Sequence, residues 1–130
     1  MHKTVGIIVP VYNEQDNVEV LADSINNELK ALNYEWHILF VDDRSTDNTL
    51  EKITELSRKN RCIKYIGLAK NSGKEAALKA GLDHTKTDCA ITMDGDMQHP
   101  PSQLPKMLAL WEEGYEVIYN HYCPIKIGSK

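Results

Sequence analysis

The chain lacks the features that mark several specialised classes of protein. Its three cysteines, Cys62, Cys89 and Cys123, have neither the spacing of a paired metal site nor the even number of a disulfide framework. We therefore expect buried free thiols in a reducing compartment, and a cytoplasmic location. No apolar run approaches the ~20 residues that span a bilayer. The first run breaks at Pro10 and lacks the cleavage pattern of a signal peptide.

Charge of one sign is never concentrated in a block either. The 130 residues carry a formal net charge of −4, and the Lys and Arg residues are scattered along the chain. This distribution argues against a nucleic-acid-binding protein, which concentrates basic residues to neutralise phosphates. Hydrophobic residues make up 42% of the sequence, and no internal repeat, low-complexity segment or linker interrupts it. Length and composition therefore predict one domain with its own core.

Apolar runs alternate with helical periodicities along the chain. Apolar residues spaced three and four apart, as in Val18, Leu21, Ile25 and Leu29, predict amphipathic helices after each of the first four strands. Right-handed crossovers place such strands in a largely parallel sheet with helices on both faces, so we predict a doubly wound α/β fold. The predicted strands are residues 4–9, 36–41, 62–68, 89–93 and 115–119.

Several residues predict where these elements begin and end. Pro10 cannot donate a ladder hydrogen bond, so we expect pairing of the first strand to stop there. Asp47 and Ser102 are suited to cap the helices that follow them. Pro105 is tolerated in the first turn of the last helix, and Gly114 ends that helix.

The most informative segment is Asp94-Gly-Asp-Met-Gln-His-Pro100, directly after the apolar run that ends at Met93. A buried strand ending there delivers two carboxylates and an amide oxygen to one edge of the sheet. Mg²⁺ and Mn²⁺ prefer oxygen ligands, and substrate phosphates fill their remaining positions. The segment therefore predicts metal-assisted handling of a diphosphate, with His99 in a supporting role. Taken alone, Asp-Gly-Asp is better explained as an acidic turn, and the other segments shift the balance towards a metal site.

Polar residues follow the other predicted strands in the same way. Tyr12 and Glu14 follow the first strand, Asp42 and Asp43 end the second, and residues 71–74 lead from the third into a helix. Each segment alone is explained by ordinary turn chemistry, and Tyr12 is either a core residue or a platform for a base. Together, they lie at the carboxyl ends of strands, where open α/β sheets bind ligands.

In order and spacing, these segments resemble the family 2 glycosyltransferases, which use nucleotide sugars and share the GT-A fold. The resemblance covers residues 4 to about 119 and is to the branch of dolichol-phosphate mannose synthase and bactoprenol glucosyltransferase. Its most specific part is Asp-x-Asp-x-Gln-His-Pro, whereas Arg44, Lys70 and Ser72 depart from residues common in the family. The matching segments are Val9-Pro-Val-Tyr-Asn-Glu14, Val41-Asp-Asp-Arg-Ser-Thr-Asp47, Asn71-Ser-Gly-Lys-Glu-Ala-Ala77 and Met93-Asp-Gly-Asp-Met-Gln-His-Pro-Pro101.

The resemblance implies roles for individual residues. Asp94, Asp96 and Gln98 would hold Mg²⁺ or Mn²⁺, and Asp94 and Asp96 would be the catalytic residues. The residues implied to bind the nucleotide are Pro10, Tyr12, Glu14, Asp42, Asp43, Asn71, Lys74, Asp94 and Gly95.

The activity implied by the resemblance is inverting transfer of a sugar from a UDP- or GDP-linked donor to a polyprenyl phosphate, as in cell wall or lipopolysaccharide biosynthesis. A lipid phosphate is already ionised, whereas a sugar hydroxyl acceptor would need a general base. The resemblance assigns residues 1–119 to the nucleotide-sugar-binding domain and leaves 120–130 as a divergent tail. We expect a truncated form, with acceptor-facing and membrane-anchoring segments beyond it, and an exposed strand edge that favours a homo-oligomer.

Two other classes of protein remain as alternatives. A phospho-receiver domain is also doubly wound and binds Mg²⁺ at an acidic cluster. Its acidic pair would follow the first strand, whereas Asp42 and Asp43 follow the second. The other alternative is a nucleotide-sugar-binding fragment without transfer activity, which an assay of donor turnover would distinguish from an enzyme.

Overall fold

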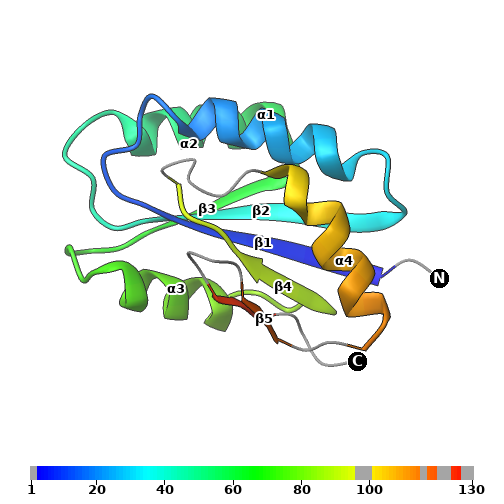
Figure 1. Ribbon diagram of the computed structural model, residues 1–130. Coiled ribbons are helices and arrows are strands. Elements are labelled where there is room, and N and C mark those ends of the chain that lie inside the picture. The colour runs from blue at the N-terminus through cyan, green and yellow to red at the C-terminus, as the bar shows by residue number, and fades with distance from the viewer. Residues whose placement is uncertain (1–2, 96–100, 115–116, 120–123, 127–130) are drawn as a thin grey trace.

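A four-stranded parallel sheet forms the centre of the molecule (Figure 1). The computed structural model describes residues 3–95, 101–114, 117–119 and 124–126. The strands lie in the order β3-β2-β1-β4, so β1 is flanked by β2 on one side and β4 on the other. Their bounds are β1 Lys3–Val11, β2 Tyr34–Asp42, β3 Ile63–Gly67 and β4 Cys89–Thr92.

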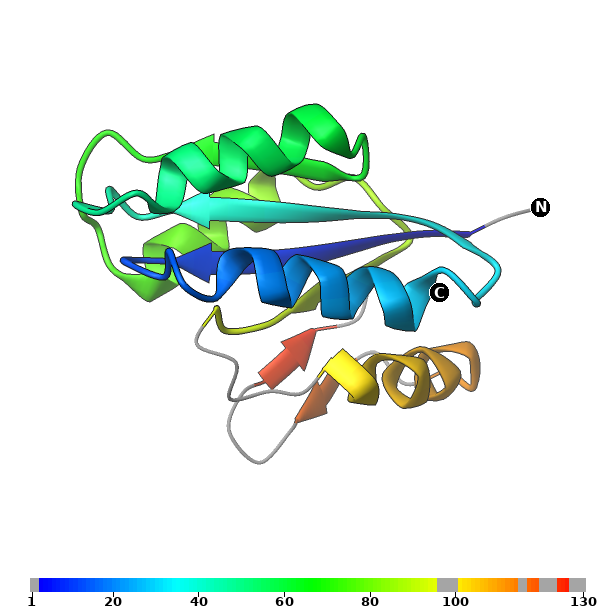
Figure 2. The ribbon, with the colours of Figure 1, turned by 90° about the horizontal axis from the view of Figure 1, so that it is seen from above.

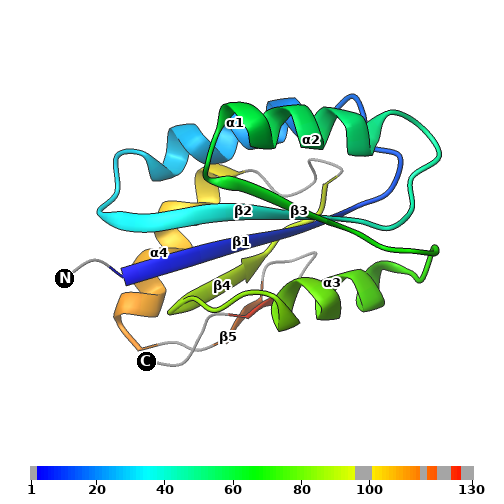
Figure 3. The same ribbon diagram turned by 180° about the vertical axis from the view of Figure 1, so that it is seen from behind.

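Helices cover both faces of this sheet. Helices α1 (Val18–Leu29), α2 (Thr49–Lys59) and α4 (Leu104–Glu112) lie on one face, whereas α3 (Lys74–Asp83) lies on the other (Figures 1 and 3). The chain adds β2 and β3 to one side of β1 and then returns to add β4 on the other side. The predicted doubly wound α/β fold is therefore confirmed.

The alternation of side chains along β1 builds the two layers of the core. Val5, Ile7 and Val9 pack in the cluster that holds the apolar faces of α1 and α4. Ile8 points to the opposite face, where it packs with Ala77 of α3. Because both faces are covered, the strand is a near-continuous apolar run rather than an alternating one, as expected for a parallel sheet.

The expectation that pairing of the first strand stops at Pro10 was wrong. The parallel register of β1 and β2 continues through Pro10 to Val11, and the Asp43 N–H donates to the Val11 carbonyl at 2.9 Å. On the other side, the Met93 N–H donates to the Ile8 carbonyl at 2.9 Å. Successive residues of a strand turn their backbone groups to opposite neighbours. The missing N–H of Pro10 therefore faces the side of β4 and leaves pairing with β2 intact.

The last predicted strand does not join the parallel sheet. Strand β5 (Val117–Tyr119) pairs antiparallel with β6 (Pro124–Lys126), and the pair forms a separate two-stranded sheet (Figure 2). Strands β5 and β6 are joined by residues 120–123 alone. A parallel pair needs a crossover of a dozen or more residues, so such a short connection permits only antiparallel pairing of these two strands. Strand β6 lies against β4.

The predicted helix ends were partly right. Asp47 lies one residue before Asn48, the N-cap of α2, which makes no side-chain cap bond. The Asp47 carboxylate nevertheless accepts hydrogen bonds from the N–H and hydroxyl of Thr49, the first residue of α2. Ser102 does not cap α4, because it lies inside the 3-10 turn η1 (Pro101–Gln103) that precedes the helix. Pro105 does lie in the first turn of α4, and Gly114 follows the helix with a positive φ of 108°.

Two of the three cysteines lie among the described residues, and neither forms a disulfide bond. Cys89 is buried, whereas Cys62 is only partly covered. Cys123 lies outside the described residues. No helix in the described ranges is both long enough and apolar enough to span a bilayer.

Candidate functional site

A pocket of about 190 Å³ lies where β1 and β4 end side by side. This is the switch point of the sheet, because the strand order reverses between these two strands. Ligands of open α/β sheets bind in the crevice outside the carboxyl ends of such strands. The pocket is lined by Pro10, Val11, Tyr12, Glu14, Asp43, Lys74, Ala77, Asp94 and Gly95.

Most of the residues predicted to bind a nucleotide line this pocket. The two exceptions are Asp42 and Asn71, whose side chains contact the polypeptide beside it instead. Val11 and Ala77 line the pocket without having been predicted. Sequence reasoning missed them because an apolar residue in a strand or on a helix has no chemical signal beyond packing.

Asp43 holds the start of α3 against the end of β2. Its carboxylate accepts the N–H of Ser72 at 2.7 Å and that of Gly73 at 2.9 Å. The Asn71 amide donates to the Asp43 backbone carbonyl at 3.0 Å. Gly73 has a φ of 95°, which favours glycine because it has no Cβ. Asp43 therefore supports the wall of the pocket while exposing part of its surface to it.

Asp42 and Asn13 hold the next two loops together. The Asp42 carboxylate, 2% exposed, accepts hydrogen bonds from the hydroxyl and the N–H of Ser45. The Ser45 hydroxyl in turn accepts the Asn13 N–H at 2.9 Å. Asn13 has a positive φ of 54°, and its side-chain oxygen accepts the N–H of Thr46 at 2.8 Å. The loop carrying Tyr12 is thus fixed by a network that begins at Asp42.

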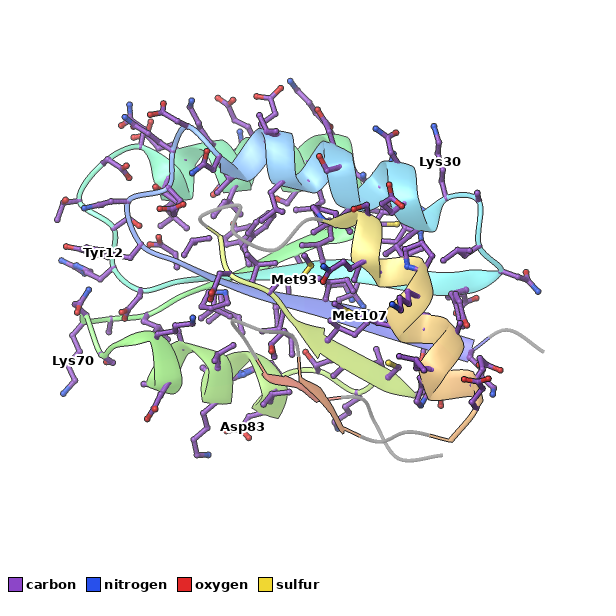
Figure 4. The ribbon with its side chains drawn as sticks, viewed as in Figure 1. Tyr12, Lys30, Lys70, Asp83, Met93 and Met107 are labelled. Carbon is purple, nitrogen blue, oxygen red and sulfur yellow. The ribbon has the colours of Figure 1, made fainter. Side chains whose placement is uncertain are left out.

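Glu14 and Tyr12 form the side of the pocket that follows β1. The Glu14 N–H donates to the buried Thr49 hydroxyl at 2.9 Å, and its carboxylate accepts the Asn17 amide at 3.0 Å. Tyr12 is 46% exposed, and Figure 4 shows it with Lys70 at the same end of the molecule. Tyr12 is therefore a surface residue at the mouth of the pocket, which leaves its ring accessible to a ligand.

An ion pair crosses the pocket between α3 and the segment after β4. The Lys74 ammonium contacts Oδ1 of Asp94, and the side chains are 52% and 13% exposed, respectively. Gly95 lies directly against the end of β1, where a Cβ would be 2.7 Å from Val11 Cγ1 and 3.2 Å from the Pro10 carbonyl oxygen. The absence of a side chain at Gly95 lets Asp94 approach the pocket.

The structure places one of the three implied metal ligands. Asp94 lines the pocket, whereas Asp96, Gln98 and His99 lie outside the described residues. No three His, Cys, Asp or Glu side chains converge on a metal-sized site within the described ranges. Asp94 nevertheless binds a cation, the Lys74 ammonium, so its carboxylate is placed where positive charge is accepted. Its hard oxygen donors suit Mg²⁺ or Mn²⁺.

The doubly wound sheet and the polar pocket at its switch point define a Rossmann-like α/β domain with a candidate ligand pocket. A model of glycosyl transferase family 2 matches residues 6–126, so the chain belongs to this family. The match includes both β5 and β6. The assignment of the domain to residues 1–119 and of a divergent tail to residues 120–130 remains a prediction.

A curated relative from Bacillus subtilis (strain 168) bears the name "Putative glycosyltransferase CsbB". It is 40% identical over 114 residues, which cover 88% of this chain and 35% of CsbB. The chain thus spans about a third of the length of this relative.

Solved structures of glycosyltransferases share the fold. TarS 1-349 of S. aureus in complex with UDP is 27% identical, with a TM-score of 0.71, over 88% of this chain and 34% of TarS 1-349. The second structure is the mannosyltransferase PcManGT from Pyrobaculum calidifontis in complex with GDP-Man and Mn²⁺. It is 23% identical, with a TM-score of 0.71, over 90% of this chain and 34% of the PcManGT chain. The predicted GT-A fold is therefore confirmed.

Proposed function

We propose that the chain forms the donor-binding part of a metal-dependent, inverting glycosyltransferase that moves a sugar from a UDP- or GDP-linked donor to a polyprenyl phosphate. One observation carries the donor half of this proposal. The pocket at the switch point gathers an exposed aromatic ring, Tyr12, three carboxylates and the Lys74 ammonium. The three carboxylates belong to Glu14, Asp43 and Asp94.

The chemistry of these side chains matches the parts of a nucleoside diphosphate. The Tyr12 ring offers a face on which a base can stack. Carboxylates accept hydrogen bonds from ribose hydroxyls and from base N–H groups. Lys74 carries a positive charge at the start of α3, close to the first N–H groups of that helix, and both favour phosphate oxygens.

Asp94, Asp96 and Gln98 would hold the divalent cation. When bound, the cation would neutralise charge that develops on the departing nucleoside diphosphate. The oxygen donors of the three residues suit Mg²⁺ or Mn²⁺, and the ammonium on Asp94 supports a cation at this place. The presence of Mn²⁺ and GDP-Man in PcManGT, a protein of the same fold, also supports it.

The acceptor is assigned from the resemblance of residues 94–100 to the branch that uses polyprenyl phosphates. An ionised phosphate oxygen attacks without prior loss of a proton, so the chain's residues need only bind and orient the reactants. A polyprenyl acceptor would place the reaction at the cytoplasmic face of a membrane.

Calorimetry with UDP and GDP, with Mn²⁺ or with chelator, tests the donor site. We expect Asp96→Ala to weaken the Mn²⁺-dependent affinity for nucleoside diphosphate by at least roughly tenfold, or about 1.4 kcal/mol. Asp83→Ala is the matched control, because this carboxylate is exposed and pairs with Lys79 rather than lining the pocket. Equal affinity with metal and with chelator, in both the native chain and Asp96→Ala, would remove the metal from the proposal.

A transfer assay tests the acceptor. With labelled donor and Mn²⁺, we expect the label to be transferred to a polyprenyl phosphate in preference to a sugar with free hydroxyl groups. Preference for the hydroxyl acceptor would replace the polyprenyl assignment. Donor binding without transfer to either acceptor would identify a nucleotide-sugar-binding module.

A further inference from the structure

The Lys74–Asp94 ion pair joins two segments that are distant in the sequence. Lys74 is the first residue of α3, and Asp94 follows β4. The backbone before Lys74 is anchored, because Asp43 binds the N–H groups of Ser72 and Gly73. The lysine stem thus extends from a fixed base across the pocket to the carboxylate.

The two halves of the pair differ in freedom. The Asp94 side chain is 13% exposed, whereas that of Lys74 is 52% exposed. A lysine also carries its charge on a flexible four-carbon stem. Lys74 is therefore the member of the pair that can move away, while Asp94 stays in place.

A divalent cation and the Lys74 ammonium compete for the same carboxylate. The cation needs the lone pairs of Asp94, and its charge repels a neighbouring ammonium. The released ammonium then needs a new anionic partner. Both oxygens of Asp43 already accept backbone N–H groups, and the Glu14 carboxylate accepts the Asn17 amide. The phosphate oxygens of a bound nucleoside diphosphate would supply that partner.

We infer that Lys74 makes cation binding and diphosphate binding depend on each other at the proposed donor site. It holds Asp94 when the pocket is empty, gives way to the divalent cation and pairs with the diphosphate. Each ligand then raises the affinity for the other, because coupling between two binding sites is reciprocal. Lys74 acts here as a binding residue for the diphosphate, and the inference rests on the proposed donor site.

Titration of Mn²⁺ without nucleotide tests whether the Lys74 ammonium competes with the cation for Asp94. We expect Lys74→Met to bind Mn²⁺ at least roughly threefold more tightly than the native chain, since the competing ammonium is gone. Lys74→Arg keeps the charge and should bind Mn²⁺ as weakly as the native chain does. Lys79→Met is the matched control, because it removes one positive charge from the same helix outside the pocket.

The coupling between the cation and the diphosphate is tested by repeating the Mn²⁺ titration with saturating UDP or GDP. The result is corrected for metal bound to free nucleotide. The ratio of the Mn²⁺ dissociation constants without and with nucleotide should fall at least roughly threefold in Lys74→Met. An unchanged ratio would overturn the coupling. The competition would be overturned if Lys74→Met bound Mn²⁺ no more tightly than Lys79→Met does. It would also be overturned if none of these proteins bound Mn²⁺. A native chain that binds neither UDP nor GDP would overturn the donor site and the coupling, while the titration with Mn²⁺ alone would still measure the competition.

Discussion

Gly73 donates its backbone N–H to the Asp43 carboxylate at 2.9 Å, immediately before α3 begins. The other carboxylate oxygen accepts the N–H of Ser72 at 2.7 Å. Asp43 is 5% exposed, so this pairing takes place largely away from water. A residue assigned from the sequence to the nucleotide therefore also determines where α3 starts.

Asp43→Ala should destabilise the fold. The substitution leaves two backbone N–H groups without their charged acceptor, and we expect the free energy of unfolding to fall by at least about 2 kcal/mol. Urea unfolding measures this change. Asp83→Ala is the control, because its exposed pair with Lys79 should contribute less than about 1 kcal/mol. A loss at Asp43 no greater than at Asp83 would show that the two bonds contribute little.

Asp42→Ala should weaken the binding of UDP or GDP even without metal. The resemblance implies a hydrogen bond from the base or ribose to the Asp42 carboxylate, in addition to the bonds that this carboxylate accepts from Ser45 beside the pocket. We expect a loss of about 1–3 kcal/mol, the cost of leaving the buried partner on the nucleoside unpaired. Ser45→Ala keeps the Asp42 carboxylate but removes its hydroxyl partner, and should cost less binding. Equal losses in the two variants would show that Asp42 acts only by holding the loop. An effect confined to metal affinity would instead assign Asp42 to the metal site.

Gly95→Ala should disturb the pocket directly. The added Cβ would lie 2.7 Å from Val11 Cγ1, so the segment carrying Asp94 must move away from β1. We expect a destabilisation of about 1–3 kcal/mol, the usual cost of overpacking, together with weaker nucleotide binding. Gly67→Ala is the control, because its Cβ would meet Leu50 at an ordinary 3.8 Å. Native stability and binding in Gly95→Ala would disprove the close approach.

His37 should titrate below its ordinary pKa. Burial and then the neighbouring Lys64 charge lower the pKa of this imidazole from 6.5. The unfolded chain therefore binds the proton first as pH falls below 6.5, and stability decreases between that value and the pKa of the folded protein. NMR titration of the His37 ring measures the pKa, and Lys64→Gln should raise it. A native pKa at or above 6.5 would contradict the burial argument.

The order of strands and helices could be read from the sequence for a local reason. A strand covered on both faces must be apolar at nearly every position, as β1 is from Val5 to Val9. A helix that packs on one side keeps an apolar stripe, as α1 does at Leu21, Ile25 and Leu29. Turn residues such as Asn13 and Gly73 marked the loops between them. Because each signal lies within one element, no partner had to be known.

Pairing between elements was decided by the tertiary structure. Pro10 ends pairing only on the side of β4, which depends on the direction its missing N–H faces. Residues 117–119 have the composition of a strand, yet their partner is β6 rather than the parallel sheet. A three-residue apolar run specifies extended backbone but not the neighbour to which it bonds.

The site shows the same division between local and long-range information. The sequence by itself determined that carboxylates, an aromatic ring and a lysine follow the strands, and parallel strands bring such ends to one edge. Only the tertiary structure decided that Asp43 binds the turn before α3, that Asn13 binds Thr46, and that Lys74 reaches Asp94. These contacts depend on the distance and angle at which α3 and the loops pack on the sheet. Side-chain packing across the whole core sets that geometry, so it is not encoded in any one segment.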